Sequence, residues 1–240
     1  ILRKYQEEDF QIDYEYRCFY SAYDQMDDPA DFEPLRDLVE NIYTNEYLET
    51  LLPKWNAAIQ EPDALMALPL QRDFYARNLK NVKERTVVII SDAMRYEVGK
   101  ELFRRIQDDP KCTAKLEVQL GVLPSYTRLG MAALLPHTEL TMTDDFKVLV
   151  DGFPCENLAE REAILQKYSS DSACVQFDSI KSLKIADLRS IFTGKQVVYV
   201  YHNQIDARGD KPNTEDEVFV ACHEAITEII DLIRRISTSA

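Results

Sequence analysis

The stretch that most constrains the fold is the apolar run Thr86–Ile90, which reads TVVII. It is dominated by β-branched residues and does not alternate with polar ones, which is typical of a strand buried on both faces of a parallel sheet. Ser91 and Asp92 follow directly, and a helical pattern then extends from about residue 95 to residue 107. An acid at the carboxyl end of a central strand lies where open α/β sheets bind ligands. The stretch therefore indicates an enzyme domain.

Strand-like and helix-like patterns alternate along the rest of the chain. Further strands are expected at residues 114–120, 140–142, 147–150, 173–177 and 196–201. Helices are expected at residues 125–135, 158–167, 185–190 and 217–236. This order, without internal repeats, predicts an α/β fold with a three-layer α/β/α core.

Residues 1–80 show a different pattern. Aromatic and aliphatic side chains recur there every three or four positions, with Arg17 inside the apolar stripe, as in helices that pack on one another. Asp31 is expected to cap one of these helices, with Pro34 in its first turn. The segment holds 17 acids and 8 bases. We therefore expect a helical segment over residues 1–80 and an α/β domain over residues 81–240.

The composition excludes several classes of protein. A net charge of −14 argues against direct nucleic-acid binding, because phosphate recognition needs clustered cations. No apolar run of about 18 residues appears, so no membrane association is expected. The five cysteines form no CxxC pair, which indicates free thiols in a reducing compartment. These features predict a cytoplasmic protein. The chain begins with Ile inside a helical pattern, which suggests a fragment.

Oxygen-bearing side chains follow three of the expected strands. The candidates are Asp92 in the first loop, Ser125 and Thr127 in the second, and His202, Asp206 and Asp210 in the third. Crossover connections in parallel sheets are right-handed, so these loops are expected to converge at one edge. Carboxylates beside a hydroxyl at a helix N-terminus suit a divalent metal ion and a phosphate.

Each candidate also has a structural interpretation. Asp92 is a possible cap for the helix after it, and Ser125 is a possible cap for the helix at Thr127. His202 is a possible satisfied polar residue at a strand end. Asp206 and Asp210 fit a solvated loop equally well. The common placement after strands is what favours a site.

Three motifs carry a family resemblance: DAMRYE (92–97), LPSYTRLGMAALLPH (123–137) and YHNQIDARGDK (201–211). They closely resemble the PglZ family of bacteriophage-exclusion (BREX) proteins, within the alkaline phosphatase superfamily. DYEYRCFYSAY (13–23) is similar to the region that precedes the domain in that family. The resemblance covers nearly the whole chain.

The resemblance implies a metal-dependent hydrolase of phosphomonoesters or phosphodiesters, with zinc or manganese as the expected metal. Asp92 maps onto a metal ligand, and Thr127 onto a nucleophile that also touches the metal, with Ser125 as second choice. Asp206 and Asp210 map onto a second metal pair. Aspartate stands there where the family pattern has histidine, which favours a harder cation. Arg95, Ser125 and His202 are expected to bind the substrate phosphate. Arg128, Arg208 and Lys211 are the alternatives to Arg95.

The resemblance also implies that part of the site is missing. The superfamily carries an Asp-His pair after a later strand and a further histidine, and nothing after Lys211 matches them. We therefore expect a truncated alkaline-phosphatase-like core, with little or no activity and with no metal bound at Asp92. Expected partners are other BREX defence proteins and a phosphate-containing substrate. The alternative is a non-catalytic assembly module with a vestigial metal pocket, whose acidic, Tyr-rich helical segment binds other proteins.

Overall fold

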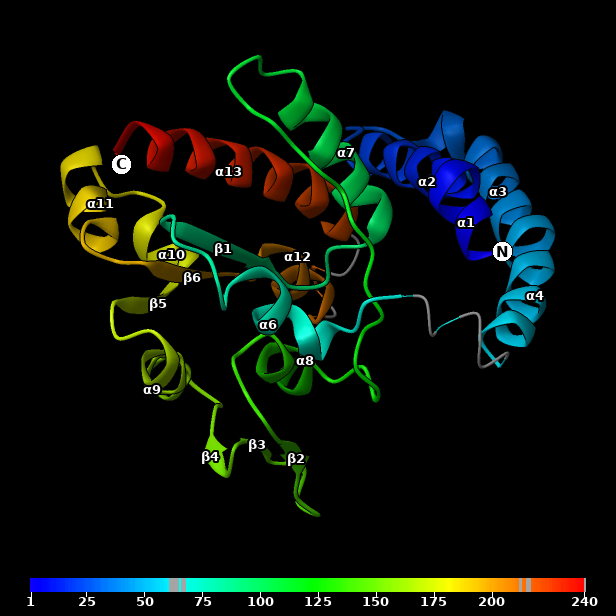
Figure 1. Ribbon diagram of the computed structural model, residues 1–240. Coiled ribbons are helices and arrows are strands. Elements are labelled where there is room, and N and C mark those ends of the chain that lie inside the picture. Colours follow the sequence, from blue (N-terminus) through cyan, green and yellow to red (C-terminus); the bar gives the residue numbers. More distant parts are fainter. Residues whose placement is uncertain (61–64, 66–67, 212, 215–216, 240) are drawn as a thin grey trace. The chain divides into compact units, whose positions relative to one another are not determined.

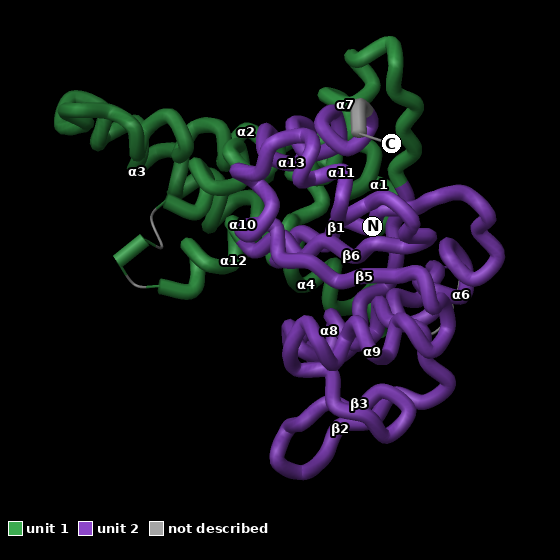
Figure 2. Tube along the Cα trace, turned by 90° about the vertical axis from the view of Figure 1, so that its left-hand side faces the viewer, with its two compact units in different colours: residues 1–67, 93–116, 204–226 green, residues 68–92, 117–203, 227–240 purple. Residues whose placement is uncertain are grey.

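The computed structural model describes residues 1–60, 65, 68–211, 213, 214 and 217–239. The chain forms two compact units, each assembled from three separate stretches of sequence (Figure 2). We call them the helical unit (residues 1–67, 93–116 and 204–226) and the sheet unit (residues 68–92, 117–203 and 227–240). The boundary at residue 80 stays a prediction.

The sheet unit is built on three parallel strands in the order β1–β6–β5 (Figure 1). These are β1 (Thr86–Ser91), β6 (Val197–His202) and β5 (Ser172–Gln176). All six residues of the middle strand, β6, are buried. The apolar run Thr86–Ile90 lies in β1 and pairs in parallel with β6, which contains most of the stretch QVVYVY. Parallel pairing of two apolar strands is expected for a sheet with helices on both faces.

Alternate residues of the strands face two separate cores. One core contains Ile90, Tyr199 and Tyr201 and includes side chains from α8 (Thr127–Ala133) and α9 (Leu158–Tyr168). The other contains Val198 and Val200 and is covered by α10 (Phe177–Ile180), α11 (Ile185–Phe192) and the end of α13 (Val218–Ser239). The predicted three-layer arrangement is confirmed.

A small antiparallel sheet follows α8. It consists of β2 (Leu140–Met142), β3 (Val148–Val150) and β4 (Phe153–Pro154), which confirms the expected strand pair. α9 then begins with a capping box, in which Asn157 accepts from the Glu160 backbone N–H while the Glu160 carboxylate accepts in return. The sheet unit also contains the short helices η4 (Gln71–Asp73) and α6 (Phe74–Asn78).

The strand predicted at residues 114–120 was wrong. Leu120 makes one isolated parallel bridge to Leu70, and the residues before it form no strand. Half-buried and exposed positions do alternate along this segment, as the sequence AKLEVQL indicated. Alternation shows only that one face is covered, however, and it carries no information about whether a neighbouring strand is available for hydrogen bonding. Ser125 and Thr127 therefore do not follow a sheet strand.

The helical unit contains the predicted helices of the N-terminal segment. Their bounds are α1 (Leu2–Lys4), η1 (Tyr5–Asp9), α2 (Phe10–Tyr23), η2 (Ala30–Phe32), α3 (Glu33–Asn41), η3 (Ile42–Leu48) and α4 (Glu49–Ile59). Later stretches add α7 (Tyr96–Gln107), α12 (Gln204–Gly209) and the beginning of α13. Phe32, not Asp31, is the N-cap residue of α3, because a 3₁₀ turn occupies the positions before it. No helix in the described part of the chain has the length and apolar character needed to cross a bilayer.

Candidate functional site

Asp92 lies immediately after β1, in the sheet unit. Its backbone N–H donates to the carbonyl of His202 at 2.9 Å, which continues the β1–β6 ladder by one step. Ala93 then takes a positive φ of 60°, a conformation that is uncommon for a residue with a side chain. α7 starts only at Tyr96, and Arg95 is its N-cap residue. Asp92 is therefore not the N-cap residue of α7, and its side chain is half-buried.

Thr127 is the first residue of α8, and both it and Ser125 are exposed. Tyr126 occupies the N-cap position, and no side chain caps the helix. The alternative in which Ser125 caps this helix is therefore also wrong. The segment before it contains a cis Leu123–Pro124 peptide bond. Two hydroxyl groups are thus presented at the start of α8 without a structural hydrogen bond to that helix.

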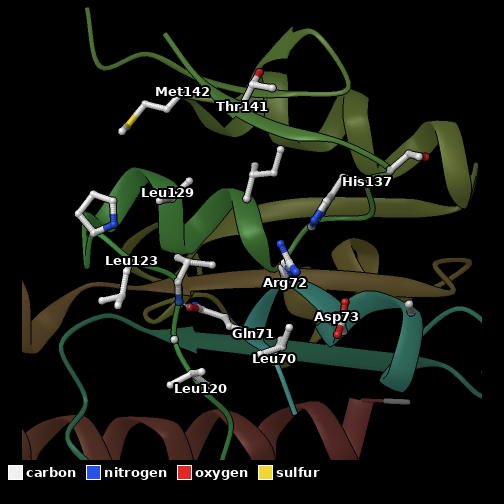
Figure 3. A pocket seen from close by; sticks show the side chains of 16 residues that line it. Leu70, Gln71, Arg72, Asp73, Leu120, Leu123, Leu129, His137, Thr141 and Met142 are labelled. Carbon is white, nitrogen blue, oxygen red and sulfur yellow. Dashed lines mark hydrogen bonds between the residues drawn. The ribbon is translucent and has the colours of Figure 1, made fainter. Parts of the chain in front are cut away.

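Gln71 of η4 holds the segment that leads into α8 (Figure 3). Its side-chain Oε1 accepts from the backbone N–H of Val122 at 3.0 Å, and its Nε2 donates to the carbonyl of Gly130 at 3.3 Å. Its backbone N–H donates to Leu120 O at 2.9 Å. One glutamine therefore contacts the chain on both sides of Ser125 and Thr127.

A cavity of about 810 Å³ lies beside this segment in the sheet unit. Figure 3 shows apolar side chains, among them Leu123, Leu129 and Met142, together with the polar groups of Arg72 and His137. None of the predicted site residues in the described chain lines this cavity. This cavity is therefore separate from the candidate side chains.

His202 ends β6 and is 1% exposed. Its Nδ1 lies 3.0 Å from Ser91 Oγ, its Nε2 lies 3.1 Å from Glu228 Oε2, and its ring meets Phe177 edge-on. Burial is the largest influence on its pKa and lowers it, although Glu228 opposes this effect. The imidazole is therefore enclosed on the α10–α13 face of the sheet.

The other predicted residues meet in the helical unit. Arg95, Asp206 and Asp210 line one cavity of about 340 Å³. Asp206 and Asp210 lie one turn apart on and just after α12, and the N–H of Asp210 donates to the carbonyl of Asp206 at 2.9 Å. Two carboxylates and an exposed guanidinium thus border the same space.

Arg17 and Glu97 line the same cavity and were not predicted as site residues. Arg17 Nε donates to Glu97 at 2.8 Å, and its Nη2 donates to Glu101 at 2.5 Å, which joins α2 to α7. Both glutamates and the arginine are buried. An arginine within the apolar stripe of residues 1–80 is the sequence signal for this network, since a buried cation requires a buried partner.

The two glutamates respond differently to this arginine. Burial raises the pKa of Glu97, and the hydrogen bond from Arg17 only partly offsets that effect. Burial acts in the same direction on Glu101, but the hydrogen bond and charge of Arg17, with Arg105, outweigh it and lower its pKa. The network therefore favours ionisation at Glu101 and opposes it at Glu97.

The metal-binding capacity of these residues is incomplete. Among the described residues, no group of three or more His, Cys, Asp or Glu side chains is placed to hold a metal ion. Asp206 and Asp210 offer two carboxylate groups, whose oxygens suit a hard cation, but a stable site needs more ligands. The donor set in this chain alone does not fit a complete metal centre.

Comparison with known proteins identifies the family. A family model described as the BREX system PglZ alkaline phosphatase-like domain matches residues 73–240. The chain is 40% identical over 240 residues to the alkaline phosphatase-like protein PglZ of Bacillus cereus (strain H3081.97), covering 97% of this chain. It is 37% identical over 249 residues to the alkaline phosphatase-like protein BrxZ of Escherichia coli O9:H4 (strain HS), covering 98% of this chain.

The chain spans 28% of the length of each of these two relatives. The comparison with solved structures found no match. The family model covers most of the chain and includes all three motifs that carry the resemblance. This chain therefore belongs to the PglZ family of BREX alkaline phosphatase-like domains.

Proposed function

We propose that this chain is part of a metal-dependent phosphate-ester hydrolase that acts in BREX phage defence, with Thr127 as the nucleophile and Asp92 as a metal ligand. The observation that carries the proposal is the family match over residues 73–240, which includes both residues. The geometry supports the role of Thr127, because this residue is exposed at the first position of α8 and no side chain caps that helix. Other BREX proteins are the proposed partners, and the cytoplasm is the proposed location.

The proposed reaction begins when Thr127 Oγ1 attacks the phosphorus atom. A new bond forms between that oxygen and phosphorus, the bond to the ester oxygen breaks, and the hydroxyl proton is lost to water while the leaving alkoxide takes up a proton. Water then attacks the phosphorus of the threonine adduct, and the bond to Thr127 Oγ1 breaks as that oxygen takes up a proton. A monoester substrate releases phosphate in this step, and a diester releases a phosphomonoester. A bound divalent ion would supply Lewis-acid stabilisation of the phosphoryl oxygens, with ligands from Asp92 and from outside this chain.

For the candidate residues of the helical unit we propose roles in binding a cation and a phosphate group. Asp206 and Asp210 would contribute oxygen ligands to a second, harder cation, which needs further ligands beyond those described here. Arg95 would bind a phosphate oxygen, since its guanidinium is exposed on the same cavity. For His202 we propose a positioning role, because its buried ring lies between Ser91 at the end of β1 and Glu228 of α13.

Turnover of p-nitrophenyl phosphate and bis-p-nitrophenyl phosphate by the full-length protein, with added zinc or manganese, tests the proposal. Thr127→Ala is expected to lower kcat by about a hundredfold or more, while Thr127→Ser retains part of the activity. Ser125→Ala is the matched control at the same helix start. If Ser125→Ala abolishes turnover and Thr127→Ala does not, the assignment of the nucleophile is wrong. The 240-residue chain alone is expected to show little or no turnover.

A further inference from the structure

A groove of about 580 Å³ lies between α2 and the α3–η3 helix of the helical unit. Its lining is mainly aromatic and aliphatic, with Ile12, Tyr16, Phe19, Val39, Ile42 and Tyr43. This composition is typical of a groove that takes apolar side chains from a partner. It is separate from the cavity that Arg95, Asp206 and Asp210 line.

Tyrosines fix the two walls of this groove. The ring of Tyr16 on α2 stacks on Tyr43 of η3, with centroids 3.7 Å apart. The hydroxyl groups of Tyr16 and Tyr20 both donate to Glu40 of α3, each at 2.7 Å. The Tyr43 hydroxyl donates back to Asp13 of α2 at 2.8 Å. The groove is therefore formed before any ligand arrives, which lowers the entropy cost of binding.

Large apolar side chains continue outward from the groove. Leu35, Leu38 and Ile42 are 45%, 54% and 46% exposed, and their spacing of three and four places them on one face of the helix. Ile12, on the opposite wall, is 43% exposed. Single exposed apolar residues are ordinary on a protein surface, but a helical row beside an apolar groove indicates an interaction site.

The charges around the groove indicate the charge of the partner that it binds. Residues 1–60 contain 14 acids and five bases. Four of those bases already make ion pairs, namely Arg3 with Glu7, Lys4 with Asp9, Arg17 with Glu97 and Glu101, and Arg36 with Asp37. Glu15 in the groove wall makes no ion pair with the described residues. The groove therefore lies in a negative field that favours a cationic ligand and disfavours an anionic one.

We propose that this groove binds an amphipathic helix of a partner protein whose apolar stripe is flanked by Lys and Arg. The apolar anchors of such a helix, spaced three and four residues apart, would enter between Ile12 and Ile42. Its cations would lie against Glu15 and the neighbouring acids. A nucleic acid does not fit this surface, because its phosphates would meet the same negative field.

Two synthetic helical peptides of about 18 residues, roughly five turns, test the proposal with the full-length protein. Both carry the same leucine stripe, and one is flanked by Lys and Arg, the other by Glu. Binding is measured by fluorescence anisotropy at low and moderate salt. The basic peptide is expected to bind at least tenfold more tightly than the acidic one, and its affinity is expected to fall as salt rises.

Substitutions distinguish binding of the peptide in the groove from its general electrostatic attraction to an acidic protein. Ile42→Ser and Glu15→Lys are each expected to weaken binding of the basic peptide about tenfold. Leu52→Ser and Glu49→Lys on α4 are the matched controls, since Leu52 is 50% exposed and neither residue lines the groove. Circular dichroism shows whether each variant stays folded. The proposal is overturned if the basic peptide does not bind, if both peptides bind equally, or if the α4 variants weaken binding as much.

Discussion

Arg17 is a buried cation in the helical unit. It is 2% exposed and links α2 to α7 through two glutamates that are also buried. Removal of the guanidinium leaves the buried Glu97 without its cation and leaves Glu101 with Arg105 alone. We expect Arg17→Met to lower the free energy of unfolding by about 3–5 kcal/mol. Urea denaturation followed by the fluorescence of Trp55, the single tryptophan, measures the change within this unit.

Arg3 provides the control for this prediction. It pairs with Glu7 at 2.8 Å, at a similar separation to the Arg17–Glu97 pair, but both partners are exposed. Exposed pairs contribute little because water and salt screen them. Arg3→Met is therefore expected to leave the urea midpoint nearly unchanged. Equal effects of the two substitutions would show that burial of the Arg17 network does not matter to stability.

The two glutamates of this network predict opposite pH effects. The pKa of Glu101 lies below its ordinary value of 4.5, so ionised Glu101 stabilises the fold above that pH, and the contribution is lost as pH falls through the folded pKa. The pKa of Glu97 is raised, so the folded state binds its proton more readily and gains stability as pH falls. Glu101→Gln should therefore make the acid-induced loss of stability shallower, and Glu97→Gln should make it steeper.

Urea midpoints of the two variants and the parent, measured between about pH 3 and pH 6, test both signs at once. Each substitution keeps the side-chain shape and removes the titration together with the negative charge that faces Arg17. The prediction fails if both variants change the slope in the same direction.

At the scale of elements, the sequence predicted the strands and helices whose positions depend on hydrophobic periodicity alone. The buried strands β1, β5 and β6 and the helices α7, α9 and α13 lie close to their predicted ranges, because period-two, period-3.6 and continuous apolar patterns report burial directly. The segment 114–120 shows the limit of this information. A strand also needs a partner backbone, and that partner is far away in sequence.

The same limit applies to the start of α8. Its position depends on Gln71, some 51 residues before the Val122 amide that it holds, and no local pattern marks a glutamine for this role. We expect Gln71→Leu to remove one hydrogen bond at Val122 and one at Gly130. A hydrogen bond to a part-buried backbone group contributes about 1 kcal/mol, so amide exchange at residues 120–130 should accelerate several-fold.

Hydrogen-exchange mass spectrometry of the peptide that covers residues 120–130 measures this effect. Arg72→Leu is the matched control, because Arg72 is the next residue of η4 and lines the same cavity without contacting that backbone. Similar acceleration in both variants would mean that η4 as a whole, rather than the Gln71 amide, holds the segment.

At the scale of the whole molecule, the candidate residues fall into two groups. Asp92, Ser125, Thr127 and His202 belong to the sheet unit, whereas Arg95, Asp206 and Asp210 belong to the helical unit. The motifs identified these residues because their chemistry is visible in the sequence. Arg17 and Glu97 were missed, since the sequence does not show that a stripe arginine from α2 meets the cavity of the DAMRYE segment.

The small number of metal ligands in this chain leads to a prediction about metal binding. The described residues provide no cluster of three ligands, and the chain spans 28% of the length of its PglZ and BrxZ relatives. We therefore expect the 240-residue chain to bind manganese or zinc only weakly and the full-length protein to bind tightly, because two carboxylates rarely overcome the hydration of a divalent ion.

Isothermal titration calorimetry of both proteins with each metal measures the difference. In the full-length protein, Asp92→Ala is expected to reduce the affinity of one site by at least about tenfold, because a direct ligand is lost. Asp73→Ala is the control, since Asp73 is an exposed acid outside the proposed ligand set. Equal affinity of the short chain and the full-length protein would show that this chain holds a complete metal site. Unchanged affinity in Asp92→Ala would remove Asp92 from the ligand set and favour the assembly-module alternative.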